Sequence, residues 1–278
     1  MPKSTREEQI KELLKTPHLC GIRKLYRYRS MGSLELEGIF KGGKIYLPKP
    51  TDFIDPFECR PRLTLSLGRL GRDQYIKRSV DRIYPSAVKK TRERLIKEGK
   101  IILASNAEHI IKKVYDDFLD NTGLYCLSEV SDDILMWSHY ADGHKGLCLE
   151  FDAIIDALAN VMIFGTAIKV TYSEERPILN IVKIGEPAEY QKALLTKSNH
   201  WNYEKEWRVV NSPAEGGPGP KPFHPPSLTG VILGALISPE NKHQVMELIK
   251  RYPTKLSLYQ AKLNEIRFKV DIEPIQEI

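Results

Sequence analysis

The order of strand-like and helix-like segments limits the possible folds of this 278-residue chain more than any other feature. Residues 24–29 alternate in character, as a strand does, and several further strand-like segments follow residue 124. Helix-like segments, among them 4–15 and 188–199, do not separate these strands one by one, as they would in a doubly wound parallel sheet. Loops are expected at 50–58, held by two Phe side chains in the core, and at 212–226, which is rich in Pro and Gly and should be exposed. The sequence therefore predicts an α+β fold with a mixed or antiparallel sheet, formed by one domain over residues 1–278.

A strongly basic helical segment interrupts this pattern. Residues 69–100 contain eleven Lys or Arg and four Asp or Glu, a local charge of +7 in a chain whose net charge is +6. Helical composition continues to Asp120, with a break expected near Pro85 and a new helix expected from Ser105, so we predict a basic helical insertion at 69–120. A charge run is usually a solvated helix face, which is the interpretation we favour. The alternative is a binding surface in 69–100 for an anionic partner such as nucleic acid or a nucleotide.

No segment of the sequence favours a membrane or a metal. The first fifteen residues are charged and lack the apolar core of a signal peptide, and the longest apolar run, 230–237, is too short to span a bilayer. The four cysteines form no CxxC pair, and the histidines lack the spacing of a zinc-binding helix. We therefore expect a cytoplasmic protein with no membrane partner and no metal.

The segment WNYEKEWR, residues 201–208, contains paired carboxylates. If it is a strand, Glu204, Glu206 and Arg208 share one face and Trp207 lies on the other. The simplest interpretation is a solvated face with a surface salt bridge, which stabilises little. In a cleft, the same carboxylates could instead stabilise an oxocarbenium-like transition state. Glu206 and Glu204 are therefore the candidate catalytic residues, and we expect Glu206 to be solvent-exposed.

The segment MWSHYADGHKG, residues 136–146, mixes aromatic and polar side chains. On a helix, Met136 and Trp137 would anchor it to the core, while the residues after them would remain near the surface. A Ser–His nucleophile has little support, because no GxSxG elbow is present. We interpret the segment as one wall of a ligand cleft, with three candidate binding residues, Ser138, His139 and Tyr140.

The early strand provides a candidate for an anionic group. Its alternation puts Tyr26 and Tyr28 on one face and Arg27 and Arg29 on the other. The planar fork of an arginine binds phosphate oxygens in pairs, so Arg27 is a candidate phosphate ligand. An exposed edge strand is the competing interpretation. Tyr28, together with Trp201 from the later segment, completes the set of candidate binding residues.

Four motifs together resemble a known family. They are LYRYRSMGSLELEGIF from residue 25, DPFE at 55–58, the MWSHYA block at 136–152, and W.YE.EWR from residue 201. The chain is similar in these motifs to a widespread bacterial family known only as a domain of unknown function, which implies a bacterial, intracellular protein. One departure is Ile54, because the family usually has Asn there, and any role of that Asn does not carry over.

The order of the motifs also resembles that of ADP-ribosyltransferases. These enzymes use an early-strand Arg or His, a Ser or Tyr block and a late-strand Glu-x-Glu. Here the matching residues are Arg27, then Ser138 with Tyr140, and finally Glu204 with Glu206. The second block departs from the pattern, because those enzymes place the Ser on a strand and this sequence predicts a helix.

The second resemblance implies an ADP-ribosyltransferase-like fold and NAD as the cofactor, in an NAD-dependent ADP-ribosyltransferase or an NAD glycohydrolase. Arg27 would bind a phosphate, Tyr140 would stack on a flat ring, Glu206 would hold the ribose and Glu204 would activate the acceptor. The alternative is a non-catalytic domain that senses a nucleotide or binds a protein. The enzyme requires Arg27, Tyr140 and Glu206 to meet in one cleft, whereas the alternative does not.

Overall fold

The computed structural model describes residues 16–64, 69–159, 162–181 and 186–275. Its α-helices are α2 (Leu34–Gly42), α3 (Arg69–Ile83), α4 (Lys89–Asp120), α5 (Ile134–Tyr140), α6 (Ala153–Ala157), α7 (Pro187–Leu195) and α8 (Pro239–Lys250). Its strands are β1 (Lys24–Arg29), β2 (Lys44–Leu47), β3 (Arg62–Thr64), β4 (Gly123–Ser128), β5 (Leu147–Asp152), β6 (Ile168–Lys169), β7 (Thr171–Ser173), β8 (Ile178–Asn180), β9 (Thr196–Ser198), β10 (Glu206–Asn211), β11 (Gly219–Pro222), β12 (Leu228–Leu233), β13 (Ser257–Leu263) and β14 (Val270–Pro274). A helix expected near the N-terminus, at 4–15, lies outside the described residues.

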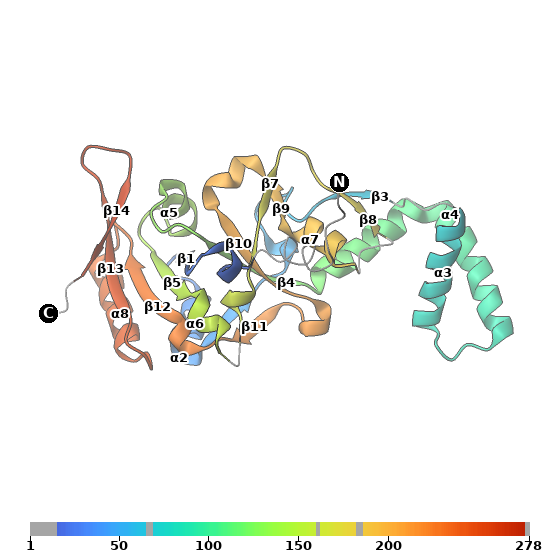
Figure 1. The fold of residues 1–278 in the computed structure, drawn as a ribbon, viewed down its shortest axis with the longest axis horizontal. Helices are drawn as coiled ribbons and strands as arrows, with labels where there is room; N and C mark the ends of the chain where they lie inside the picture. Colours follow the sequence, from blue (N-terminus) through green and yellow to red (C-terminus); the bar gives the residue numbers. More distant parts are fainter. Residues whose placement is uncertain (1–15, 65–68, 160–161, 182–185, 276–278) are drawn as a thin grey trace.

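An eight-stranded sheet forms the centre of the molecule (Figure 1), in the order β14-β13-β12-β5-β1-β4-β10-β6. Only the β12–β13 pair is parallel among these neighbours, and the others are antiparallel. Every residue of β5 is buried, which fits its near-continuous apolar sequence and its place between β1 and β12. The mixed sheet with its helices confirms the predicted α+β class.

Helices pack on both faces of this sheet. On one face, Phe40 of α2 and Val245 of α8 join a core that includes Phe151 of β5. On the other face, Trp137 of α5 is fully buried and its ring meets Tyr28 of β1 edge-on, with the centroids 5.1 Å apart. The predicted anchoring of the MWSHYA segment by its apolar residues is therefore observed, and the segment has a fixed place beside β1.

Gly146 lies where β5 approaches β1 too closely for a side chain. A Cβ at this position would be 2.1 Å from the carbonyl oxygen of Arg29, a backbone atom that cannot move without shifting the strand pair. We expect Gly146→Ala to lower the free energy of unfolding by about 3 kcal/mol. Gly32→Ala is the matched control, because a Cβ there meets nothing within 4 Å. Chemical denaturation of the two variants checks this, and equal stabilities would contradict it.

The sheet opens between β1 and β4. Six residue pairs join β1 to β5, and six join β4 to β10, but β1 and β4 pair only at Tyr26 and Ser128. Beyond that pair, the side chain of Arg27 reaches across and its Nη1 donates to the carbonyl oxygen of Cys126 at 2.5 Å. The opening thus exposes the sides of two central strands to a ligand.

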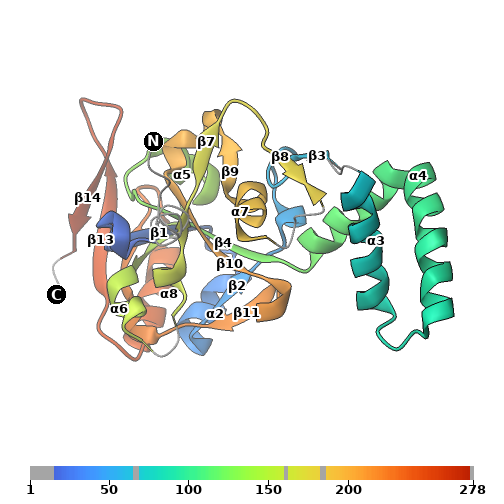
Figure 2. The same cartoon turned by 45° about the vertical axis from the view of Figure 1, so that its right-hand side comes forward.

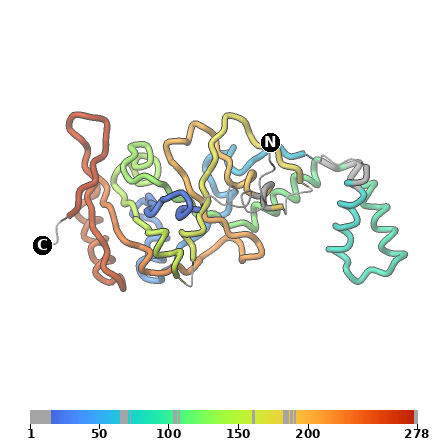
Figure 3. The backbone as a smooth tube through the Cα atoms, in the orientation of Figure 1, coloured from blue at the N-terminus to red at the C-terminus, as the bar shows by residue number. Residues whose placement is uncertain are grey.

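Helices α3 and α4 form a long hairpin that projects away from the sheet (Figures 1 and 2), and the tube in Figure 3 shows it as an arm at the far end from β13 and β14. We call residues 69–100 the arm. The turn falls at the expected Pro85, between α3 and α4. Helix α4 then continues to Asp120 with one non-helical residue, Asn106, next to Ser105, where the sequence predicted that a new helix begins.

Two local predictions were wrong. The helix expected at 188–199 ends at Leu195, and β9 follows, because the β-branched Thr196 begins a segment that pairs with β7. The segment 212–226, expected to be an exposed loop, contains β11, which pairs with β2. Within the described residues, none of the helices combines the length and apolar character needed to span a bilayer.

Candidate functional site

A cavity of about 860 Å³ lies at the opening between β1 and β4. Its wall contains residues from every motif of the sequence analysis. Among the predicted site residues, Arg27, Tyr28, His139, Tyr140, Trp201, Glu204 and Glu206 line it. The structure thus brings Arg27, Tyr140 and Glu206 to one cavity, which is the geometry that the enzyme interpretation requires. Its volume suits a small-molecule ligand, since such sites usually measure ≈ 300–1,000 Å³.

One end of the cavity is cationic. Arg27 and Arg29 share a single carboxylate there, because Arg29 forms an ion pair with Glu35 and Arg27 Nη2 lies 4.0 Å from the same oxygen. The guanidinium of Arg27 also stacks over the ring of Tyr125, 4.5 Å from its centroid. Four buried polar atoms in this group have no hydrogen-bond partner, namely Arg27 Nε, Arg29 Nε, Glu35 Oε1 and Tyr125 OH. Three of these four are donors, and this suits an anionic ligand.

The pKa of Arg29 reflects the excess positive charge. Burial and the neighbouring Arg27 lower it from 12.5 to about 9. Two guanidinium groups against one carboxylate leave this end with one uncompensated cation in a poorly solvated place. A phosphate here would relieve that repulsion.

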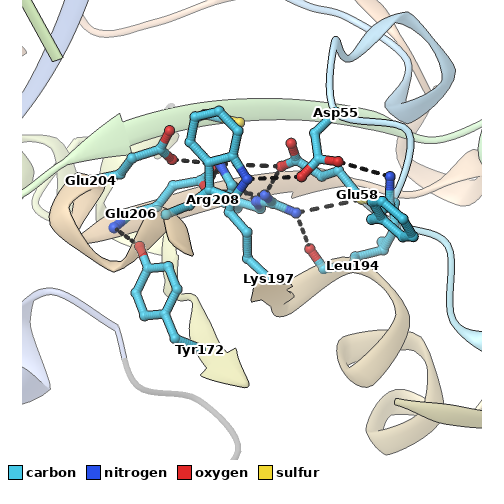
Figure 4. A network of polar contacts seen from close by, with 12 residues as sticks. Asp55, Glu58, Tyr172, Leu194, Lys197, Glu204, Glu206 and Arg208 are labelled. Atoms are coloured by element: carbon cyan, nitrogen blue, oxygen red, sulfur yellow. Dashed lines mark hydrogen bonds and ion pairs between the residues drawn. The ribbon is translucent and has the colours of Figure 1, made fainter. Parts of the chain in front are cut away.

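The opposite end holds three buried carboxylates, Glu58, Glu204 and Glu206, with two cations between them (Figure 4). Glu206 lies 2.9 Å from Lys197 Nζ and 2.7 Å from Arg208 Nε. Lys197 also pairs with Glu204, while Arg208 also pairs with Glu58. We call these five residues the charge network, and it has one more carboxylate than it has cations.

The network gives its two central carboxylates different pKa values. Burial and the nearby Glu206 raise the pKa of Glu204 to about 7, although Lys197 opposes the shift. Burial would also raise the pKa of Glu206, but Arg208 and Lys197 outweigh it and hold that pKa well below the usual range. Glu204 can therefore exchange a proton near neutral pH, whereas Glu206 stays ionised.

Aromatic side chains connect the network to the rest of the cavity. The hydroxyl of Tyr140 donates to Glu204 Oε1 at 2.6 Å. Trp201 donates through its indole N–H to Asp55 at 2.9 Å, and its ring lies beside His139 with the centroids 6.4 Å apart. This places the DPFE loop, the MWSHYA helix and the WNYEKEWR segment at one site.

Two predicted binding residues have other tasks in the structure. Tyr28 belongs to the cavity wall, but its ring packs on Trp137 and its hydroxyl donates to the carbonyl of Val130. Ser138 is exposed and does not line the cavity, and its hydroxyl donates to the carbonyl oxygen of Ile134. The helical turn of α5 directs Ser138 away from the cavity while Tyr140 faces it.

The expected exposure of Glu206 was wrong. Glu204, Glu206 and Arg208 are each at most 3% exposed. Glu204 also belongs to a 3-10 helix, Asn199–Glu204, instead of the strand, and Lys205 with φ 44° joins the two elements. Sequence alternation put the charges on a free face, but β9 and the loop at 55–58 cover that face with partners.

Sequence reasoning missed two members of the charge network. Lys197 fell in a predicted helix and Glu58 in a loop interpreted as structural. The available signal was charge balance, since two buried carboxylates beside one arginine require a further cation. Ile54, which replaces the family Asn, is 96% exposed at the cavity wall, so it occupies no buried polar position.

Groups of three or more His, Cys, Asp or Glu side chains that could hold a metal do not occur in the described part of the chain. The carboxylates of the charge network are instead bound by the nitrogen atoms of Lys197 and Arg208. The absence of a metal therefore stays a prediction.

The raised pKa of Glu204 predicts a pH-dependent stability. The folded state holds a proton on Glu204 between about pH 4.5 and 7 that the unfolded state has released, so this residue lowers stability as pH rises through that window. We expect the Tm of Glu204→Gln minus the Tm of the unchanged protein to increase as the pH is raised from 5 to 8. Glu37→Gln is the control, because the contact with Lys41 lowers the pKa of Glu37, so this carboxyl is ionised in both states across the window and its Tm difference should stay constant. Parallel Tm curves for Glu204→Gln and the unchanged protein would contradict the assignment.

The fold and the cavity together define an α+β protein with a two-ended, charged cavity. A family model described as "Protein of unknown function (DUF2971)" matches residues 136–209. The match covers the MWSHYA and WNYEKEWR segments but neither β1 nor the DPFE loop. It supports the resemblance to a domain-of-unknown-function family over that part of the chain. No curated protein and no solved structure matches the sequence.

Proposed function

We propose that the cavity binds a dinucleotide of the NAD type and breaks its N-glycosidic bond. With water as the acceptor the protein would be an NAD glycohydrolase, and with another acceptor it would be an ADP-ribosyltransferase. The main support is the two-ended charge distribution of the cavity, with unpartnered arginine donors at one end and a carboxylate of pKa about 7 at the other. An extended ligand with phosphates and a ribose matches both ends.

The cationic end suits the diphosphate. Arg27 and Arg29 both line the cavity, and each has a buried Nε without a partner. Charge-assisted bonds from arginine to phosphate are about twice as strong as bonds between neutral groups. A bound phosphate would also remove the repulsion that lowers the pKa of Arg29.

The acidic end suits the ribose and the bond that breaks. When this bond breaks, its electron pair goes to the pyridinium nitrogen, and the ribose carbon becomes an oxocarbenium-like cation. The excess negative charge of the network would stabilise this cation. Glu204, when ionised, would accept the proton of the attacking water or acceptor hydroxyl. Tyr140 and Lys197 would hold its carboxylate in place.

The geometry changes the roles expected from the sequence. Two cations, Lys197 and Arg208, hold Glu206 ionised and keep its pKa well below the range in which it could exchange a proton near neutral pH, so we propose Glu206 as a positioning residue. Glu204 becomes the residue that acts on the reacting atoms. Trp201, His139 and the ring of Tyr140 would enclose the nicotinamide and exclude water. The opening of the sheet beside β1, with Glu206 at the start of the late strand β10 and Glu204 just before it, supports the resemblance to ADP-ribosyltransferases.

The test is the release of nicotinamide from NAD, followed by proton NMR, with the purified protein and then with added candidate acceptors such as guanidino and hydroxyl compounds. The proposal expects nicotinamide and either ADP-ribose or an ADP-ribosylated acceptor. If NAD binds but stays intact under every condition, the site is a non-catalytic nucleotide sensor.

A further inference from the structure

We propose that the arm, residues 69–100, docks on the phosphate backbone of double-stranded nucleic acid. This inference goes beyond the proposed function and does not depend on it, because the arm contributes no residue to the cavity wall. Three observations support it. The arm is an extended rod (Figure 1), apolar side chains of its two helices pack against each other, and six of its exposed cations form no ion pair among the described residues.

The arm is an extended, two-helix rod that stands clear of the sheet (Figures 1 and 3). Its apolar residues are used internally, because Ile76 and Val80 of α3 pack with Leu95 and Ile96 of α4. Between the turn and residue 100, the outward faces of the two helices are consequently mostly polar. At 1.5 Å per residue, the fifteen residues of α3 extend about 22 Å, which is enough to follow several phosphates of one strand.

The arm has many more cations than carboxylates that could pair with them. Three of its four carboxylates already pair with arm cations, in Arg92–Asp81, Lys100–Asp73 and Arg94–Glu98. Six further cations are exposed and form no ion pair among the described residues, namely Lys77, Arg78, Arg82, Lys89, Lys90 and Lys97. Outside the arm, the chain has a net charge of −1. The positive charge is therefore concentrated in the part that reaches farthest from the body.

A polyanion fits this surface better than a membrane does. A helix that lies on a membrane needs a continuous apolar face, and in the arm that face is buried between the two helices. Among the described side chains of the arm, the exposed large apolar residues are Ile83, Tyr84 and Val88 near the turn, and Ile101 and Ile102 follow directly after its end. These two groups lie at the two ends of residues 89–100 and form no continuous face. Cations on the outer faces of both helices match the repeated charges of a duplex backbone.

The test measures the binding of a fluorescein-labelled 24-base-pair DNA duplex and of the matching RNA duplex by anisotropy, between 50 and 200 mM NaCl. The arm variant is Arg78→Gln, Arg82→Gln and Lys97→Gln. The control is Lys145→Gln, Lys242→Gln and Arg267→Gln, which removes three exposed cations from outside the arm. We expect the arm variant to bind at least about tenfold more weakly at 100 mM NaCl. The slope of the logarithm of its binding constant against the logarithm of the salt concentration should become shallower by up to about 0.9 for each phosphate contact that is lost.

The control variant should bind like the unchanged protein, and both variants should keep the unchanged far-UV circular dichroism and NAD binding. The proposal is overturned if neither duplex binds at 50 mM NaCl. It is also overturned if both variants lose affinity equally, or if the arm binds anionic lipid vesicles and not the duplexes. A preference for one of the two duplexes identifies whether the arm binds DNA or RNA. Because NAD binding is measured separately, failure here leaves the proposed function unaffected.

Discussion

Replacing Arg208 with Met is expected to lower the free energy of unfolding by about 3–5 kcal/mol. Arg208 has no solvent exposure, and its guanidinium contacts Glu206, Glu58 and the carbonyl oxygen of Leu194. Without it, the three carboxylates of the charge network would share only Lys197. The protein must then hold an uncompensated buried charge or take up a proton, and either outcome costs stability.

The matched control for Arg208→Met is Arg92→Met. Arg92 also forms an ion pair, with Asp81, but both side chains are more than 40% exposed. Exposed pairs contribute about 0–1 kcal/mol, so this variant should unfold almost as the unchanged protein does. Urea denaturation at pH 7 measures both variants. Similar losses in the two would show that the charge network is not the buried structural centre described above.

The second large effect concerns Glu204. If it accepts the proton of the attacking group, Glu204→Gln should reduce nicotinamide release by roughly 10²- to 10⁴-fold, because Gln keeps the shape but cannot accept a proton. Binding of NAD should change little, since the diphosphate is held at the other end of the cavity. The rate of the unchanged protein should also rise with pH near 7, where Glu204 becomes ionised.

Glu150→Gln is the control for this effect. Glu150 is another buried carboxylate, and it also contacts a lysine and a tyrosine, Lys24 and Tyr26, but it lies outside the cavity wall. Its replacement should leave nicotinamide release within a few-fold of the unchanged rate. Equal losses in the two variants, or full activity of Glu204→Gln, would remove Glu204 from the mechanism.

Local patterns were sufficient for much of the fold. The alternation at 24–29 predicted β1, and the spacing of Met136 and Trp137 predicted the buried side of α5. Charge composition identified the two helices of the arm. These features depend on neighbours in the sequence, and such periodicities survive in the folded state.

The burial of the charge network could not be predicted from local sequence patterns. The sequence set Glu206 and Arg208 on a common face, which is correct, but it could not say what covers that face. Lys197 and Glu58 come from β9 and a distant loop, and their contacts with Arg208 and Glu206 span up to 150 residues. Such long-range packing turned an expected surface salt bridge into a buried network and exchanged the roles of Glu204 and Glu206.

Calorimetric titration of NAD into the purified protein tests the central claim most directly, because it asks whether the two-ended cavity binds a dinucleotide at all. We predict one site per chain with an affinity in the millimolar range or tighter. Arg27→Met should bind about ten- to a hundredfold more weakly, through loss of a charge-assisted bond. If no heat develops at millimolar NAD, or if Arg27→Met binds as tightly as the unchanged protein, the cavity is not a dinucleotide site.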